Sequence, residues 1–279
     1  MIPAPFDYEV AESVEHATEL LGSREDPKLL AGGHSLIPLL RLRFARPSLL
    51  VDIGRVEELR YVRDAGDKLA IGALTRHHDL QNDPLIQEHC PLVSHTAAQI
   101  GDPQVRHRGT IGGSLAHGDP AADLPTVVLA LDAELVVRGP GGERVVPAAE
   151  FFRGVFETAV GEQDVLTEIR IPKLGPAGWS YVKFNRRAQD WATVAVAAVV
   201  RRSNGKVENA AVALTNMGAT PIRASATEQA LRSADDIEAA AEAVAEGTDP
   251  PSDTSGSAEY RRHLARVLTR RALSEAIAR

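Results

Sequence analysis

The sequence Ala31-Gly32-Gly33-His34-Ser35 lies between a short apolar run and a second apolar stretch that begins at Leu36. Two successive glycines allow the backbone to approach a ligand closely and to adopt positive φ, so that consecutive N–H groups can point at an anion such as a diphosphate. The Ser35 hydroxyl adds another donor. A Gly-Gly turn between two strands explains the same residues, and this segment alone does not decide between the two interpretations.

A second glycine pair occurs later in the chain, in Gly109-Thr110-Ile111-Gly112-Gly113-Ser114. It again sets two bare backbone positions beside hydroxyl groups, as an anion-binding loop requires. Two such segments far apart in the sequence favour an elongated, diphosphate-containing ligand held between two lobes. Asp123 follows closely and can accept hydrogen bonds from ribose or ribityl hydroxyls, although capping of a helix at Leu124-Pro125 is an equally good explanation.

No standard nucleotide or metal motif accounts for these glycines. The sequence contains neither G-x-G-x-x-G nor G-x-x-x-x-G-K-[ST], and neither H-E-x-x-H nor C-x-x-C. The nine histidines are dispersed apart from His77-His78, whose adjacent side chains need not face one site. A dinucleotide would therefore be held in another way, and no metal site is expected.

The composition narrows the class of protein. With 279 residues, 44% hydrophobic content and a net charge of −7, the chain is long enough for two or three compact units and lacks a basic surface for nucleic acid or an anionic membrane. Cys90 is the only cysteine, so the chain can build neither an internal disulfide nor a thiolate iron–sulfur cluster. We find no signal peptide or transmembrane segment and expect a cytoplasmic protein whose partners are small molecules or proteins.

The hydrophobic pattern predicts a first α+β lobe over residues 1–55. A helical pattern runs from Ser13 to Gly22, and apolar runs at Lys28 to Ala31 and Leu49 to Ile53 predict strands. A second unit is expected over residues 56–174. Its predicted elements are strands at Lys68 to Gly72, Glu134 to Arg138, Val145 to Val146 and Glu168 to Ile171, and a helix at Pro91 to Ile100.

Two further stretches differ from this regular pattern. Gly101 to Pro125 contains five glycines and three prolines, which predicts an irregular and therefore functional segment. The Pro/Gly-rich link from Lys173 to Gly178 predicts the start of a third unit over residues 175–279. This unit should be a smaller α+β domain, with strands at Ala192 to Val200 and Ala210 to Leu214 and helices at Ile237 to Ala245 and Glu259 to Ala278.

Longer stretches around these segments carry a family resemblance. Ala31 to Pro38, Gly101 to Arg106 and Thr110 to His117 closely resemble the two FAD-binding signatures of the molybdopterin dehydrogenase flavoprotein family. This family comprises the medium subunits of molybdenum hydroxylases of the carbon monoxide dehydrogenase and xanthine dehydrogenase type. Lys183 to Thr193 resembles the entry into the family's C-terminal domain, and Gly256 to Leu273 resembles its terminal helix. The resemblance spans nearly the whole chain.

The resemblance implies a fold and a set of cofactor-binding residues. The fold is a two-lobed FAD-binding domain of the vanillyl-alcohol-oxidase, or PCMH, type, followed by a smaller α+β domain that closes over the flavin. Ala31 to Ser35 and Thr110 to Ser114 would surround the diphosphate, Asp123 would bind the ribityl hydroxyls, and Leu166 and Lys183 would lie near the isoalloxazine. The full set is Ala31, Gly32, Gly33, His34, Ser35, Leu36, Thr110, Gly112, Gly113, Ser114, Asp123, Leu166, Lys183 and Trp191.

Some positions depart from the family pattern or allow two roles. Trp191 stands where carbon monoxide dehydrogenase relatives carry a tyrosine against the flavin ring, which implies aromatic packing there; core packing against Phe184 is the alternative. His107 replaces an asparagine of many relatives. His34 and His117 are expected to position the cofactor through hydrogen bonds rather than to act as acids or bases, because flavin oxidation by electron transfer needs no dedicated base.

The resemblance also implies a function. This chain would carry FAD and accept electrons from two-iron, two-sulfur clusters on a small iron–sulfur subunit, which receive them from a molybdenum–pterin centre on a large subunit. An external acceptor would then oxidise the flavin, in a dimer of heterotrimers. Two alternatives are a self-sufficient FAD oxidase or dehydrogenase of the same fold and an assembly subunit without flavin. The sequence leaves open the acceptor and the substrate, whether carbon monoxide, a purine, an aldehyde or a heterocycle.

Overall fold

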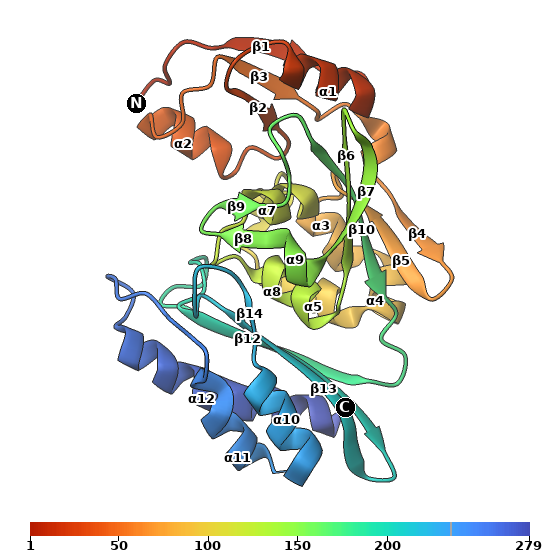
Figure 1. Ribbon diagram of the computed structural model, residues 1–279, viewed down its shortest axis with the longest axis vertical. Coiled ribbons are helices and arrows are strands. Elements are labelled where there is room, and N and C mark those ends of the chain that lie inside the picture. The colour runs from red at the N-terminus through yellow and green to blue at the C-terminus, as the bar shows by residue number, and fades with distance from the viewer. Residues whose placement is uncertain (235) are drawn as a thin grey trace.

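The computed structural model describes residues 1–234 and 236–279, which form three units stacked along the long axis of the molecule (Figure 1). Each unit has its own main sheet, with strands inside residues 7–52, 62–172 and 178–223, here called lobe 1, lobe 2 and the C-terminal domain. The mixture of helices and strands in each unit confirms the expected α+β class. The boundaries at residues 55 and 174 stay predictions.

Lobe 1 is a three-stranded parallel sheet with the strand order β1-β3-β2. The helix expected from Ser13 is confirmed, and the Ser13 side chain accepts a hydrogen bond from the His16 N–H as its N-cap. The two predicted strands are confirmed as well, whereas the first strand was not expected. The elements are β1 (Asp7–Val10), α1 (Val14–Gly22), β2 (Pro27–Leu30), α2 (Leu36–Leu42) and β3 (Leu49–Asp52).

Lobe 2 is built on a five-stranded antiparallel sheet with the order β4-β5-β10-β6-β7. Its largest helices pack on one face of this sheet (Figure 1) and share one apolar core with it. The elements are η1 (Glu57–Leu59), β4 (Val62–Ala65), β5 (Lys68–Gly72), α3 (His77–Asn82), α4 (Pro84–His89), α5 (Pro91–Ala98), α6 (Pro103–Arg106), α7 (Ile111–His117), α8 (Asp123–Ala130), β6 (Glu134–Gly139), β7 (Gly142–Pro147), α9 (Ala148–Phe151), β8 (Phe152–Gly154), β9 (Glu157–Thr158) and β10 (Val165–Pro172).

The prediction of an irregular segment from Gly101 to Pro125 was wrong, because α6, α7 and the start of α8 lie within it. Its prolines and glycines occupy helix ends rather than interrupting helices. Pro103 is the first residue of α6, and Gly118 ends α7 in the left-handed conformation at φ 64°. A side chain caps the N-terminus of each of these two helices. The Asp102 carboxylate accepts a hydrogen bond from Val105 N–H in α6, and the Thr110 hydroxyl accepts one from Gly113 N–H in α7.

The C-terminal domain is an antiparallel sheet with the order β11-β12-β13-β14 and two covered faces. Along β12, Ala195 and Ala197 belong to the core shared with lobe 2, whereas Val194 and Val196 belong to the core under the terminal helices. The strand predicted at Ala192 to Val200 corresponds to β12, and it has few polar residues because both of its faces are buried. The elements are β11 (Gly178–Phe184), β12 (Val194–Ser203), β13 (Lys206–Thr215), β14 (Ile222–Arg223), α10 (Ser225–Ala234), α11 (Ile237–Glu242), η2 (Ala243–Ala245) and α12 (Ala258–Ala278).

Two features are absent from residues 1–234 and 236–279. None of their helices combines the length and apolar character needed to cross a membrane. Their His, Cys, Asp and Glu side chains form no group of three or more that could hold a metal ion.

Close packing of β11 on α12 yields a test of the C-terminal domain. A Cβ atom on Gly178 would overlap the Ala276 carbonyl of α12, so the strand and helix must separate to accept a methyl group. We expect Gly178→Ala to lower the free energy of unfolding by roughly 1–3 kcal/mol, measured by urea denaturation. Gly141→Ala is the matched control, because no atom lies within 4 Å of its added Cβ. If the two variants unfolded at the same urea concentration, the result would contradict the close packing of Gly178 on α12.

Candidate functional site

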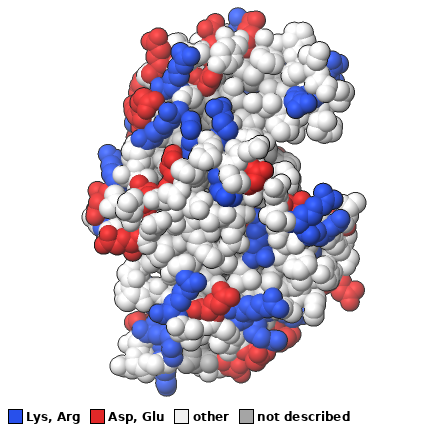
Figure 2. All heavy atoms as spheres, turned by 180° about the vertical axis from the view of Figure 1, so that it is seen from behind, with Lys and Arg blue, Asp and Glu red and all other residues white. Residues whose placement is uncertain are grey.

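A cavity of about 420 Å³ is lined by residues of lobe 1, lobe 2 and the C-terminal domain. In Figure 2 the surface is hollowed at the right-hand edge, below lobe 1. Every residue that the sequence predicted for cofactor binding lines this cavity, although the three units contribute them from distant parts of the chain. They are Ala31, Gly32, Gly33, His34, Ser35, Leu36, Thr110, Gly112, Gly113, Ser114, Asp123, Leu166, Lys183 and Trp191. Their individual roles toward a cofactor stay predictions.

The first glycine segment has the open geometry expected of an anion-binding loop. Gly33 adopts a φ of +79°, a left-handed conformation that favours glycine. Within the part of the chain that the structure describes, no acceptor is found for the N–H groups of residues 32–36. Ser35 precedes α2 but makes no side-chain capping hydrogen bond, so its hydroxyl is also available. This segment offers a row of donors to the cavity.

The second glycine segment works differently from the prediction, because its N–H groups are already paired. Ile111 N–H donates to the Thr75 carbonyl and Gly112 N–H to the Ala73 carbonyl, while Gly113 N–H donates to the Thr110 hydroxyl. Gly112 is required for close packing, since its Cβ would lie 2.5 Å from the Ala73 Cβ. The segment is the tightly packed first turn of α7, and it shapes the cavity wall more than it offers free donors.

The two segments touch each other directly. A Cβ atom on Gly32 would overlap the Arg108 carbonyl, so only glycine allows this approach. Residues 109 and 110 are themselves tied to the start of α3: His77 N–H donates to the Gly109 carbonyl at 3.0 Å, and Arg76 forms a β-bridge with Thr110. One wall of the cavity is therefore continuous from lobe 1 to lobe 2.

A buried ion pair joins lobe 2 to the C-terminal domain at the cavity. Lys183 Nζ on β11 lies 2.9 Å from Asp123 Oδ2 at the start of α8, and their side chains are only 4% and 7% exposed. The Tyr181 hydroxyl donates to Asp123 Oδ1 at 2.6 Å. Burial raises the pKa of the Asp123 carboxyl, an effect that the Lys183 ammonium and the hydrogen bonds from Tyr181 and Lys183 oppose. Asp123 thus anchors two domains, a role that the sequence did not predict.

His77 also lines the cavity and was not predicted as a site residue. Its side chain is 4% exposed, and its Nδ1 atom is enclosed without a hydrogen-bond partner among the described residues. Burial lowers the pKa of His77 to about 4, with smaller contributions from His34 and Arg106. The neighbouring His78 is half-buried and stacks on His107 with ring centroids 4.0 Å apart. The pair His77-His78 was the only sequence signal, and it did not show which of the two faces inward.

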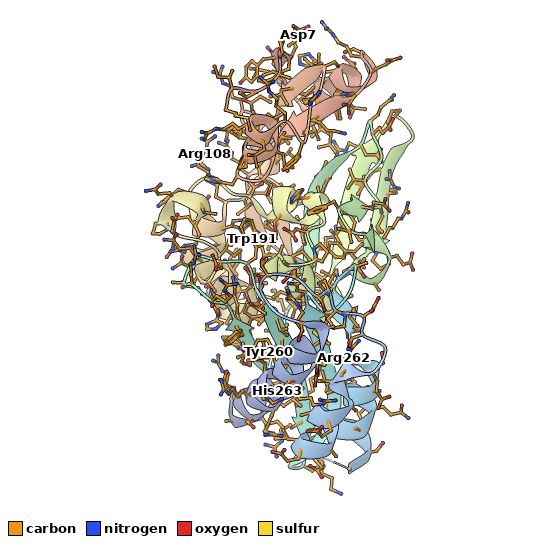
Figure 3. All side chains as sticks on the ribbon, turned by 90° about the vertical axis from the view of Figure 1, so that its left-hand side faces the viewer. Asp7, Arg108, Trp191, Tyr260, Arg262 and His263 are labelled. Atoms are coloured by element: carbon orange, nitrogen blue, oxygen red, sulfur yellow. The ribbon has the colours of Figure 1, made fainter. Side chains whose placement is uncertain are left out.

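Trp191 lies on the connection between β11 and β12 and is 66% exposed at the cavity. Figure 3 shows it where lobe 2 meets the C-terminal domain, between Arg108 above and Tyr260 below. Core packing of Trp191 against Phe184 is wrong, since Phe184 instead meets the Tyr260 ring edge-on at 6.3 Å. An exposed indole at the edge of a cavity is suited to cover a flat ligand.

The remaining predicted positions lie in the wall. Leu166 is buried on β10, one residue before a bulge in its pairing with β6. His34 is exposed beside the first glycine segment. His117 packs against Phe156, with ring centroids 4.9 Å apart, and burial lowers its pKa. Both histidines line the cavity, and their role in positioning a cofactor stays a prediction.

Comparison with known proteins gives consistent matches along the whole chain. A family model described as the FAD binding domain in molybdopterin dehydrogenase matches residues 4–174, and one described as the CO dehydrogenase flavoprotein C-terminal domain matches residues 179–276. The carbon monoxide dehydrogenase medium chain of Hydrogenophaga pseudoflava is 43% identical, with 100% of this chain and 99% of that protein covered. The 6-hydroxypseudooxynicotine dehydrogenase complex subunit alpha of Paenarthrobacter nicotinovorans is also 43% identical, over 100% and 97%.

A solved structure agrees with these matches. It is that of carbon monoxide dehydrogenase from Hydrogenophaga pseudoflava lacking the Mo-pyranopterin moiety of the molybdenum cofactor. One of its chains superimposes with a TM-score of 0.97 at 45% identity, and the match covers 100% of this chain and 99% of that one. The expected two-lobed domain followed by a smaller C-terminal domain is thereby confirmed.

The Asp123–Lys183 pair yields a stability prediction. Asp123→Asn leaves the buried Lys183 ammonium beside a neutral amide, and we expect the free energy of unfolding to fall by about 3 kcal/mol, measured by urea denaturation. The double variant Asp123→Asn, Lys183→Met removes the uncompensated charge and should recover most of that loss. Unchanged stability of the single variant, or no recovery in the double variant, would show that the ion pair does not hold the domains together.

Proposed function

This chain belongs to the FAD-binding flavoprotein family of the molybdopterin dehydrogenases, and from that premise we propose that its cavity holds one FAD as the electron-transferring medium subunit of a molybdenum hydroxylase. The observation that carries the proposal is the row of N–H groups over residues 32–36, which have no acceptor among the described residues and lie in the wall of a cavity shared by all three units. Main-chain donors of this kind suit a diphosphate.

The residues present fit this cofactor. Residues 31–36 would bind the diphosphate, and Thr110 and Ser114 would add hydroxyl groups from the second segment. Asp123 still has acceptor lone pairs beyond its bonds to Lys183 and Tyr181, so it can take ribityl hydroxyls while it holds the domains. Leu166 and Trp191 would contact the ring system.

The protein supplies binding and orientation, while bound FAD supplies the redox chemistry by taking up electrons and passing them to an acceptor. Trp191 can pack over a flat ring and limit its contact with water. Lys183 places a positive charge at the cavity, although Asp123 largely neutralises it. In the free protein His77 is neutral at pH 7, given its pKa of about 4. None of these groups has to act as a general base.

The source of electrons lies on partner chains. Relatives are medium chains of multi-subunit dehydrogenases, and the single cysteine here, Cys90, is buried and free. A small iron–sulfur subunit and a large molybdenum subunit would therefore complete the enzyme. Assembly as a dimer of heterotrimers, an external electron acceptor and a cytoplasmic location complete this proposal, and they rest on the family resemblance.

The substrate of the complete enzyme is not selected by this chain. The identity is 43% both to a carbon monoxide dehydrogenase medium chain and to a subunit of a 6-hydroxypseudooxynicotine dehydrogenase complex. Two enzymes whose names specify such different substrates carry equally similar chains. Substrate choice is therefore assigned to the large partner subunit.

The test is the visible absorption spectrum of the purified chain after gel filtration, with FAD, FMN or neither added. We expect flavin bands with FAD, and at least tenfold weaker FAD binding in Gly33→Val, because valine disfavours the +79° φ at this position and its Cβ would lie 2.7 Å from Ile37 Cδ1. Gly141→Val is the control in an open turn and should bind FAD like the wild type.

Other outcomes separate the alternatives. A folded chain that binds no flavin under any condition would support an assembly subunit. Anaerobic bleaching of the flavin by an organic substrate, with no partner chain present, would indicate a self-sufficient oxidase or dehydrogenase. The proposed subunit instead keeps an oxidised spectrum alone and is reduced only in the complex.

A further inference from the structure

The cavity provides little fixed positive charge for a diphosphate. Its lining contains no arginine within the described residues, and its two lysines are already paired. Lys183 lies 2.9 Å from Asp123, and Lys28 lies 3.2 Å from Asp26. Asp119 and Asp190 add further acidic side chains to the wall. An anionic ligand therefore needs a counter-charge from another source, and the histidines of the cavity can provide one.

His77 is the histidine best placed for this purpose. It lies beside the contact between the two glycine segments: its N–H donates to the Gly109 carbonyl, and a Cβ on Gly109 would come within 2.9 Å of its Nε2. Its Nδ1 has no hydrogen-bond partner among the described residues although the ring is almost completely buried. The ring therefore makes no hydrogen bond through Nδ1 inside the described part of the protein, and it lines the cavity in which the ligand would lie.

We propose that His77 takes up a proton when FAD binds and serves, as an imidazolium, as the buried counter-charge of the diphosphate. The proposal rests on the proposed function, because it requires FAD in this cavity. The proton comes from solvent and returns to it on release, so no oxidant or other reactant is needed.

The electrostatic surroundings set the direction of the effect. In the free protein, burial holds the pKa of His77 at about 4, with smaller contributions from the nearby His34 and Arg106. These two are the charged or titratable groups that act on it, from the loop after β2 and from α6. A diphosphate raises this pKa because it favours the charged form. Between the two pKa values FAD binding takes up as much as one proton, and affinity falls by up to tenfold for each unit that the pH rises.

The experiment is a titration of the purified chain with FAD at several pH values between 5.5 and 8. Binding is measured by the quenching of flavin fluorescence. We expect the Kd to increase as the pH rises and then to level off. In weakly buffered solution with an indicator dye, FAD should cause proton uptake, whereas riboflavin, which lacks the diphosphate, should cause none. Absence of proton uptake by the wild type overturns the proposal without any variant.

Two variants assign the proton to a residue. His77→Gln should abolish the pH dependence and should bind FAD more weakly than the wild type at pH 5.5, because glutamine cannot become a cation. His78→Gln is the matched control, since this neighbour has a side chain that is 42% exposed and does not line the cavity, so its loss should leave the pH dependence intact. A pH dependence that persists in His77→Gln overturns the assignment. Failure of the folded wild type to bind FAD at any pH would instead count against the proposed function.

Discussion

The buried contact of Asp123 with Lys183 and Tyr181 is the interaction on which the rest of the site depends. It links the first residue of α8 in lobe 2 to β11 of the C-terminal domain, at distances of 2.9 and 2.6 Å. Removing a carboxylate and an ammonium from water is costly, so such a pair persists only when both partners are held accurately. The position of β11 relative to lobe 2 is thereby fixed, and the connection that carries Trp191 emerges from the end of that strand.

Close backbone packing provides the second constraint, at the opposite side of the cavity. Gly32 lies against the Arg108 carbonyl, and Gly112 lies against Ala73, so two of the conspicuous glycines serve contact between protein segments. Of the two glycine segments, the first has a row of N–H groups without an acceptor in residues 1–234 and 236–279. Residues 32–36 therefore form a wall of the cavity that carries main-chain donors. The first turn of α7 packs against this segment and cannot shift without breaking its own hydrogen bonds. This rigidity favours binding, because little has to be ordered when a ligand enters.

The sequence predicted the α+β class and many residues that line the cavity, and its failures have physical causes. Alternating and helical patterns identified α1, β5, β6 and α12 because each buries apolar side chains, and the Gly/Pro-rich turn at residues 139–142 identified the β6–β7 hairpin. The segment from Gly101 to Pro125 was predicted to be irregular because its glycines and prolines mark helix ends, and composition alone does not distinguish an end from a break. The roles of Asp123 and His77 depend on partners up to 60 positions away, Lys183 among them, which no local pattern reveals.

The central claim is that FAD occupies the cavity between the three units, with Trp191 over its ring. The chain has only two tryptophans, so in Trp179→Phe the emission reports on Trp191 alone. The most direct measurement is the tryptophan fluorescence of this variant during an FAD titration. We expect strong quenching that ends at one FAD per chain. Flavin that remains bound through gel filtration while Trp191 emission is unchanged would place the cofactor elsewhere and contradict the account.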